Sequence, residues 1–287
     1  MSPRSITPPV LIVQAPTLSI VSYLYRTARA ARQIPGCARM FLMNLYRETV
    51  LGWWWLIFRA LLPTLGIIAI FQHIPALKPP GLPYPLYVIS GMVFWIVVST
   101  TLLRGARALQ VTRRLFGKLT APKLVFLLAS GSMPACFSLI FAVVLAGGIV
   151  FEYFVTGNLY LKLDWPLLLC PIPILVAFLL CIGICCFTSV AFLLARDVRY
   201  VISLITQFWF YLTPVIYTLD IMPPSWQFAI SYLNPLASLI EFFRWTLFGI
   251  GTWHATALMT AIVVSIVIFL LGVRFLMRTE WALSELI

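Results

Sequence analysis

The stretch SYLNPLASLIEFFRW, residues 231–245, decides how this chain folds. It is apolar enough to favour lipid, yet Pro235 interrupts it and two charged residues follow. Because proline breaks a helix interior, the apolar residues around it form two pieces, 225–233 and 236–248. A membrane crossing needs about 20 apolar residues, so neither piece is long enough. The aromatic side chains of both pieces make a solvated loop costly, and we expect two half-helices that enter the outer leaflet and return as a re-entrant hairpin.

The rest of the chain is that of an integral membrane protein. Of its 287 residues, 62% are hydrophobic and only 10% are charged, and the mean hydropathy is +1.02. Soluble domains contain about half apolar and a quarter charged residues. The apolar residues occur in long runs, which favours an all-α fold over a β-barrel. Six runs are predicted as transmembrane helices: residues 52–72, 84–103, 128–150, 172–194, 200–219 and 255–275.

The positive charges predict the orientation. Residues 1–50 carry six arginines, and the connection between the second and third runs carries six Lys and Arg residues with no acid. The connection between the fourth and fifth runs and the C-terminal segment add two arginines each, against three basic residues on the other side. By the positive-inside rule, both termini lie in the cytoplasm, which in a bacterium means a chain of the inner membrane. Because the net charge of +12 is explained by this topology, we expect no nucleic-acid partner.

Two cytoplasmic segments are predicted to be helical outside the spans. Residues 39–51 place Asn44, Arg47 and Glu48 on one arc, which indicates either an amphipathic helix in the interface or an extension of the first span. After the second span, Arg104, Arg107, Arg114 and Lys118 share one helical face, which would meet a partner protein or lipid headgroups, or only solvent. We expect residues 1–36, rich in Pro and Arg, to be partly disordered and residues 37–287 to form the transmembrane domain.

The hairpin contains its own polar groups. Asn234 is placed to cap the second half-helix, with Pro235 at its first position. Glu241 and Arg244 are three residues apart on that half-helix, so they can form an ion pair. This pair would either hold the hairpin together or contact a polar substrate in a hydrated path. Reversing the charge of either residue should impair assembly or export. If the two residues depend only on each other, exchanging them should restore part of that loss.

No motif of an enzyme or a metal site is present in the sequence. The nearest approach to a phosphate-binding loop, FGKLT at residues 116–120, has Leu119 where Ser or Thr must follow the lysine. The six cysteines and two histidines lack the spacing of a metal site, and we expect the cysteines to be packing residues. Arg59 is the only charge clearly inside one of the six runs, so ion coupling is not expected. A chain that moves a solute uphill must then take its energy from another subunit.

Two stretches of the sequence resemble the permeases of polysaccharide-export ABC transporters. YRETVLGWWWLIFRALLPTLGIIAIF, residues 46–71, is similar to their entry from an amphipathic helix into the first span. LTPVIYTLDIMPPSWQFAISYLNPLASLIEFFRWTLFG, residues 212–249, is similar to a signature that combines SPVIY, NP and a later Glu and Arg. The resemblance covers about residues 38–278 and includes exporters of O-antigen, capsule and teichoic acid. It offers no role for residues 1–36.

The resemblance implies a homodimer paired with two copies of a separate ATPase subunit, which would bind the ATP and Mg²⁺; this chain would hold no cofactor. The hairpin would close the outer end of a central channel, with a gate built from Pro214, Tyr217, Asn234, Pro235, Glu241 and Arg244. The ATPase would dock on basic residues of the two cytoplasmic helices, namely Arg47, Arg104, Arg107, Arg113, Arg114 and Lys118.

A glycan substrate agrees with the aromatic content of two spans. Sugar rings pack on flat aromatic side chains, which also offer hydrogen bonds, whereas the same residue types commonly form an interfacial belt. The candidates for lining a channel are Trp53, Trp54, Trp55, Phe58, Phe208, Trp209 and Tyr211. We therefore expect a lipid-linked polysaccharide as the substrate. The alternatives are a drug or small-molecule exporter and a membrane-embedded glycosyl- or acyltransferase, for which Glu152, Asp164 and Asp220 are the available acids.

Overall fold

The computed structural model describes residues 19–46, 54–113, 121–195, 197–251 and 253–285. Within these ranges every regular element is helical, which confirms the all-α class. The chain begins with α1 (Ile20–Arg29), the 3₁₀ turn η1 (Ala30–Gln33), α2 (Ile34–Tyr46) and α3 (Trp54–Phe71). It continues with η2 (Pro75–Leu77), α4 (Tyr84–Thr112), α5 (Leu124–Ser130), α6 (Ser132–Thr156), η4 (Trp165–Leu169) and α7 (Pro171–Leu194). The last elements are α8 (Val198–Leu212), η5 (Leu219–Ile221), α9 (Pro224–Leu233), α10 (Pro235–Phe248) and α11 (Ala255–Glu285).

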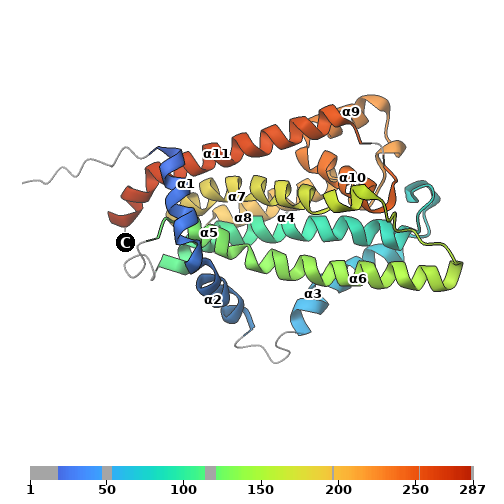
Figure 1. The fold of residues 1–287 in the computed structure, drawn as a ribbon, viewed down its shortest axis with the longest axis horizontal. Helices are drawn as coiled ribbons and strands as arrows, with labels where there is room; N and C mark the ends of the chain where they lie inside the picture. Colours follow the sequence, from blue (N-terminus) through green and yellow to red (C-terminus); the bar gives the residue numbers. More distant parts are fainter. Residues whose placement is uncertain (1–18, 47–53, 114–120, 196, 252, 286–287) are drawn as a thin grey trace, which may run out of the picture.

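The long helices form a bundle around α4. This helix packs against α3, α5, α6, α7, α8 and α10, and most of its side chains are buried. Figure 1 shows α4, α6, α7 and α11 running side by side along the length of the molecule. Four helical segments of the described chain are long and apolar enough to cross a membrane: Tyr84–Thr112, Leu124–Thr156, Trp165–Leu194 and Ala255–Glu280. The chain is therefore a helical membrane protein.

Several helix ends differ from those predicted. α4 continues to Thr112, nine residues past the expected end of the second span at residue 103, so the basic stretch with Arg104 and Arg107 is its continuation and not a separate helix. α11 likewise continues past residue 275 to Glu285. The sequence prediction stopped these helices where charges begin, but a helix can extend into water when its end packs on protein. The end of α11 packs against α1.

The fifth predicted span ends earlier than expected. α8 stops at Leu212 instead of residue 219, and residues 213–218 form no regular helix. Pro214 explains the break, because a proline there removes a donor and restricts Thr213 to extended backbone; Thr213 has φ −101° and ψ 133°. Two short helices, α9 and α10, meet at Asn234, where the sequence predicts two short apolar pieces. Twelve of the 14 residues of α10 are buried, so this helix lies inside the bundle.

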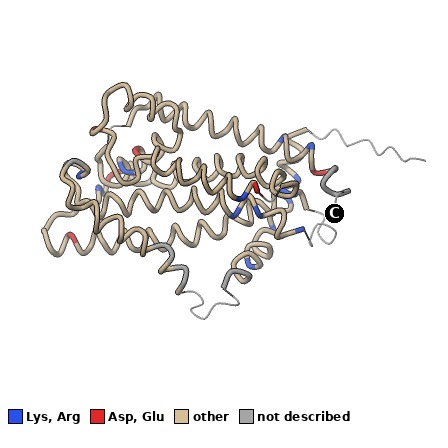
Figure 2. Tube along the Cα trace, turned by 180° about the vertical axis from the view of Figure 1, so that it is seen from behind, with Lys and Arg blue, Asp and Glu red and all other residues tan. Residues whose placement is uncertain are grey.

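The two ends of the bundle differ in charge. Figure 2 shows that most of the Lys and Arg residues lie at the end that carries the C-terminus. Figure 1 places α1 at that same end, while α9 and the loop around η2 lie at the opposite end. The expected boundary after residue 36 falls inside α2, and residues 20–33 are helical. The amphipathic helix expected at residues 39–51 is described only up to Tyr46, as part of α2.

Candidate functional site

The break after α8 is the feature around which the polar side chains gather. Outside a helix, the carbonyl groups of residues 212–218 need partners from elsewhere, because an unpaired buried carbonyl is costly. Two of these carbonyls have local backbone partners. The Thr213 carbonyl accepts from the Val215 amide at 2.7 Å, and the Thr218 carbonyl accepts from the Ile221 amide at 3.5 Å. The other five accept hydrogen bonds from side chains on α4 and α10, or at the junction of α9 and α10. We call residues 212–218 with these donors the carbonyl clasp.

Asn234 joins the clasp to the junction of α9 and α10. Its side-chain amide donates to the Leu212 carbonyl and to the Thr213 hydroxyl, each at 3.1 Å. Its side-chain oxygen accepts from the Leu236 amide at 3.1 Å, which confirms the predicted N-cap of α10 with Pro235 at the first position. The same oxygen accepts from the Trp209 indole at 2.9 Å. One side chain therefore fixes the end of α8 relative to the start of α10.

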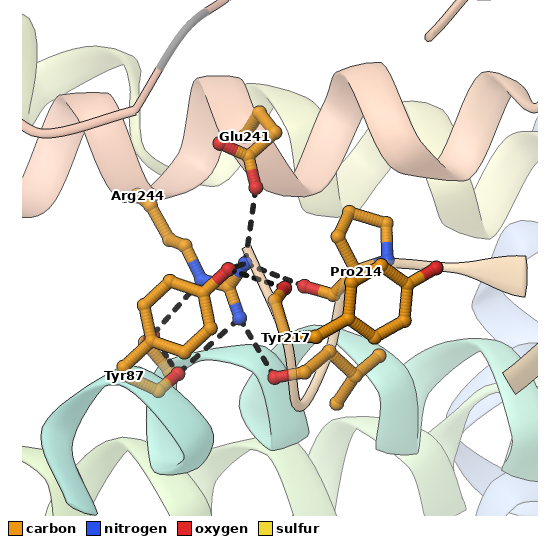
Figure 3. Close-up of polar contacts among 7 residues, drawn as sticks. Tyr87, Pro214, Tyr217, Glu241 and Arg244 are labelled. Carbon is orange, nitrogen blue, oxygen red and sulfur yellow. Dashed lines mark hydrogen bonds and ion pairs between the residues drawn. The ribbon is translucent and has the colours of Figure 1, made fainter. Parts of the chain in front are cut away.

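Arg244 is the centre of the clasp (Figure 3). Its guanidinium donates to the carbonyls of Pro214 at 2.5 Å and Val215 at 2.8 Å. It also forms the predicted ion pair with Glu241 at 3.1 Å. Arg244 is 0% exposed and Glu241 is 6% exposed. A guanidinium has five N–H donors and no acceptor, which suits a position surrounded by oxygen atoms.

The remaining partners come from α4 and were not predicted from the sequence. The Tyr87 hydroxyl accepts from Arg244 at 2.6 Å and donates to the Tyr217 carbonyl at 2.8 Å, while the guanidinium carbon lies 3.5 Å from the centre of the Tyr87 ring. Tyr84 donates to the Ile216 carbonyl at 3.0 Å. The usable signal was the spacing of Tyr84, Tyr87 and Gly91, which places them along one side of a helix in an otherwise apolar run.

Gly91 makes this approach of the arginine possible. A Cβ atom at this position would lie 2.7 Å from Arg244 Nη2 and 2.7 Å from the Val215 carbonyl oxygen. Both distances are shorter than real Cβ contacts, so only glycine leaves room for the guanidinium between α4 and the clasp. Because every group around Arg244 is buried and hydrogen-bonded, the geometry favours the structural interpretation of the Glu241–Arg244 pair over direct contact with a substrate.

Residues 32–248, which contain the whole clasp, match the family described as "ABC-2 type transporter". The chain belongs to this family. Members of the ABC-2 type transporter family are membrane subunits of ABC transporters, and the helical bundle described above agrees with such a subunit.

Three curated relatives share one name, "O-antigen export system permease protein RfbA". The protein of Myxococcus xanthus is 25% identical over 225 residues, which are 78% of this chain and 83% of the relative. Two proteins of Klebsiella pneumoniae are 23% and 25% identical over 242 and 244 residues, in both cases 84% of this chain and 90% of the relative. The similarity to these permeases therefore extends over most of this chain.

The structure places the expected aromatic residues on two separate helices. Trp54 and Phe58 lie on α3 and are 63% and 43% exposed. Trp55 also belongs to α3, and Trp53 lies outside the described residues. On α8, Phe208 and Tyr211 are exposed, whereas the half-buried Trp209 donates its indole N–H to Asn234 of the clasp. α3 packs against α4 and α6, and α8 packs against α4 and α7.

The expected gate residues are brought together, and the expected docking residues are described in part. Tyr217 is buried and donates its hydroxyl to the Tyr211 carbonyl at 3.0 Å. Pro214, Asn234 and Arg244 take part in the clasp, Glu241 pairs with Arg244, and Pro235 is the first residue of α10. Of the docking residues, Arg104 is half-buried on α4, and Arg107 and Arg113 are exposed at its far end. Arg47, Arg114 and Lys118 lie outside the described residues.

Proposed function

We propose that this chain is the transmembrane subunit of an ABC transporter that exports a lipid-linked polysaccharide, such as O-antigen or capsule, across the cytoplasmic membrane. The observation that carries the proposal is the family match over residues 32–248 together with three relatives named as O-antigen export permeases. ATP hydrolysis on a separate subunit would drive export, and that subunit would bind ATP and Mg²⁺.

The exposed aromatic residues support a glycan as the substrate. Trp54 and Phe58 on α3 and Phe208 and Tyr211 on α8 present flat rings at the surface of a single chain. A second copy of the chain, facing the first, would enclose a hydrated path lined by such rings, on which sugars can stack. Two ATPase copies would then dock at the basic end, where Arg107 is exposed.

Co-expression with the ATPase tests this proposal. We expect the two chains to purify as one complex whose ATPase activity depends on this chain, and we expect deletion of its gene to remove the surface polysaccharide. The matched control is a deletion strain that carries the intact gene on a plasmid and regains the polysaccharide. Normal polysaccharide with altered drug tolerance would show a drug exporter instead, and transfer of sugar or acyl groups by the chain alone would show a transferase.

We also propose six spans with both termini in the cytoplasm, and a re-entrant hairpin formed by α9 and α10. The 18 residues of α3 rise about 27 Å, close to the 30 Å of the hydrocarbon core. The 15 residues of α8 rise about 22 Å, and residues 213–218, which form no regular helix, follow it at the same end of the bundle as α9. α9 and α10 have only 10 and 14 residues, begin with prolines and meet at Asn234, so each supports a half-crossing.

Labelling with a membrane-impermeant maleimide tests this topology. We expect Ser225→Cys, at the exposed start of α9, to react in intact cells, because this position faces the periplasm. The matched variant Asp197→Cys, exposed at the start of α8, should react only after the inner membrane is opened. The unmodified chain gives the background from its native cysteines. Reaction of Ser225→Cys only in opened cells would refute the re-entrant hairpin.

A further inference from the structure

The N-terminal helix α1 presents a basic and apolar face that the exporter function does not use. The chain carries no Asp or Glu between residues 19 and 46. Arg26, Arg29 and Arg32 are all exposed on α1 and η1. Val21 and Tyr25 are 77% and 67% exposed on the same helix. α1 precedes residue 32, where the family match begins.

The opposite face of α1 fixes the helix to the bundle. The Ser19 hydroxyl caps its first turn by accepting from the Ser22 amide at 3.2 Å. Tyr23 and Thr27 are buried, and the helix packs against α11. Burial raises the pKa of the Tyr23 phenol, and the nearby Glu280 carboxylate of α11 raises it further. The Tyr23 face therefore points inward and the Val21–Tyr25 face points away from the bundle.

The contact with α11 gives the depth of α1 relative to the membrane. α11 starts at Ala255 at the opposite end of the bundle, and about 20 residues cross the hydrocarbon core, which brings the helix out near residue 275. Glu280 lies five residues further along, about 8 Å beyond that point, at the depth of the headgroups. Figure 1 shows α1 lying across the bundle at this end instead of along it. This is the position of a helix in the plane of the interface.

We propose that α1 and η1 form a binding surface for anionic phospholipid headgroups on the cytoplasmic leaflet. Arg26, Arg29 and Arg32 would contact the phosphates, while Val21 and Tyr25 would insert between the headgroups and the acyl chains. The residues along the outward face are spaced to serve both purposes. Val21, Tyr25, Arg29 and Arg32 follow one another at intervals of four, four and three, so apolar side chains occupy the first half and arginines the second. This surface rests on the orientation proposed above but not on the identity of the substrate.

Hydrogen exchange of the full chain in lipid nanodiscs tests the surface. One set of discs contains phosphatidylcholine alone, and the other contains equal parts of phosphatidylcholine and phosphatidylglycerol. We expect the backbone amides of α1 to exchange roughly tenfold more slowly in the anionic discs, because each arginine near an anionic surface adds favourable binding. Salt should reduce the difference by screening the charges. Equal exchange in both lipids would overturn the proposal.

Paired variants separate lipid binding from a general effect of charge. Arg26→Gln with Arg29→Gln should remove most of the difference between the two lipids. The matched pair Arg274→Gln with Arg278→Gln removes the same charge from exposed positions on α11 and should retain the difference. Unchanged exchange in α4 reports that each variant is folded. Slow exchange of α1 that appears only when the ATPase is added, in either lipid, would assign the surface to the partner protein and overturn the proposal. Hydrogen exchange of α1 is measured without export. The lipid surface and the proposed export function can therefore fail independently of each other.

Discussion

Arg244→Met should destabilise the folded chain by about 3–5 kcal/mol, the range for removing one partner of a buried ion pair. Methionine fills a similar volume but donates nothing, so the buried Glu241 carboxylate and the carbonyls of Pro214 and Val215 lose their donor. Thermal unfolding of the purified chain, followed by the loss of its monodisperse elution peak, measures the effect. Arg278→Met, at an exposed position, is the control and should change stability by less than about 0.5 kcal/mol.

The partners of Arg244 also predict how its ion pair responds to exchange. From the sequence alone, exchanging the two residues should restore part of the assembly or export that reversing either charge removes. In the structure, Arg244→Glu would place a carboxylate against the Pro214, Val215 and Tyr87 carbonyls, which cannot donate to it. Glu241→Arg combined with Arg244→Glu should therefore be as unstable as Arg244→Glu alone. Recovery in the exchanged variant would show that Glu241 is the dominant partner and that the carbonyls contribute little.

Local spacing was sufficient to predict those parts of the site that lie on one helix. Glu241 and Arg244 are three residues apart, and Asn234 precedes a proline, so the ion pair and the cap follow from helix geometry. The rest depends on contacts between distant segments. Tyr87 is separated from Arg244 by 157 positions, and only the packing of α4 beside α10 brings them together.

Helix ends were predicted less well because composition does not report tertiary contacts. The fifth apolar run was expected to remain helical through residue 219, since its residues are apolar. In the structure Pro214 ends α8 at Leu212, and the break is tolerated because the clasp supplies donors for the carbonyls that it exposes. The basic stretch after residue 103 was predicted to be helical but not to continue the second span without a break, since charged residues were interpreted as the end of that span.

Gly91→Ala should have the second large effect, although it adds a single methyl group. The new carbon would lie 2.7 Å from both Arg244 Nη2 and the Val215 oxygen, so the guanidinium and the clasp must move away from α4. Overpacking of this kind costs about 1–3 kcal/mol. The same thermal unfolding measurement checks it, and the ATPase activity of the complex should fall because the clasp connects the end of α8 to α10.

Gly66→Ala on α3 is the matched control for Gly91→Ala. Both glycines lie inside helices, but a Cβ at Gly66 has nothing within 4 Å. Alanine is favoured over glycine in a helix by about 1 kcal/mol, so Gly66→Ala should be neutral or stabilising. Val215→Ala should not rescue Gly91→Ala, because it removes the Cγ1 contact at 3.1 Å but leaves the carbonyl contact in place. Full rescue by Val215→Ala would mean that the Val215 side chain, and not the approach of the guanidinium and the carbonyl, is what requires glycine at this position.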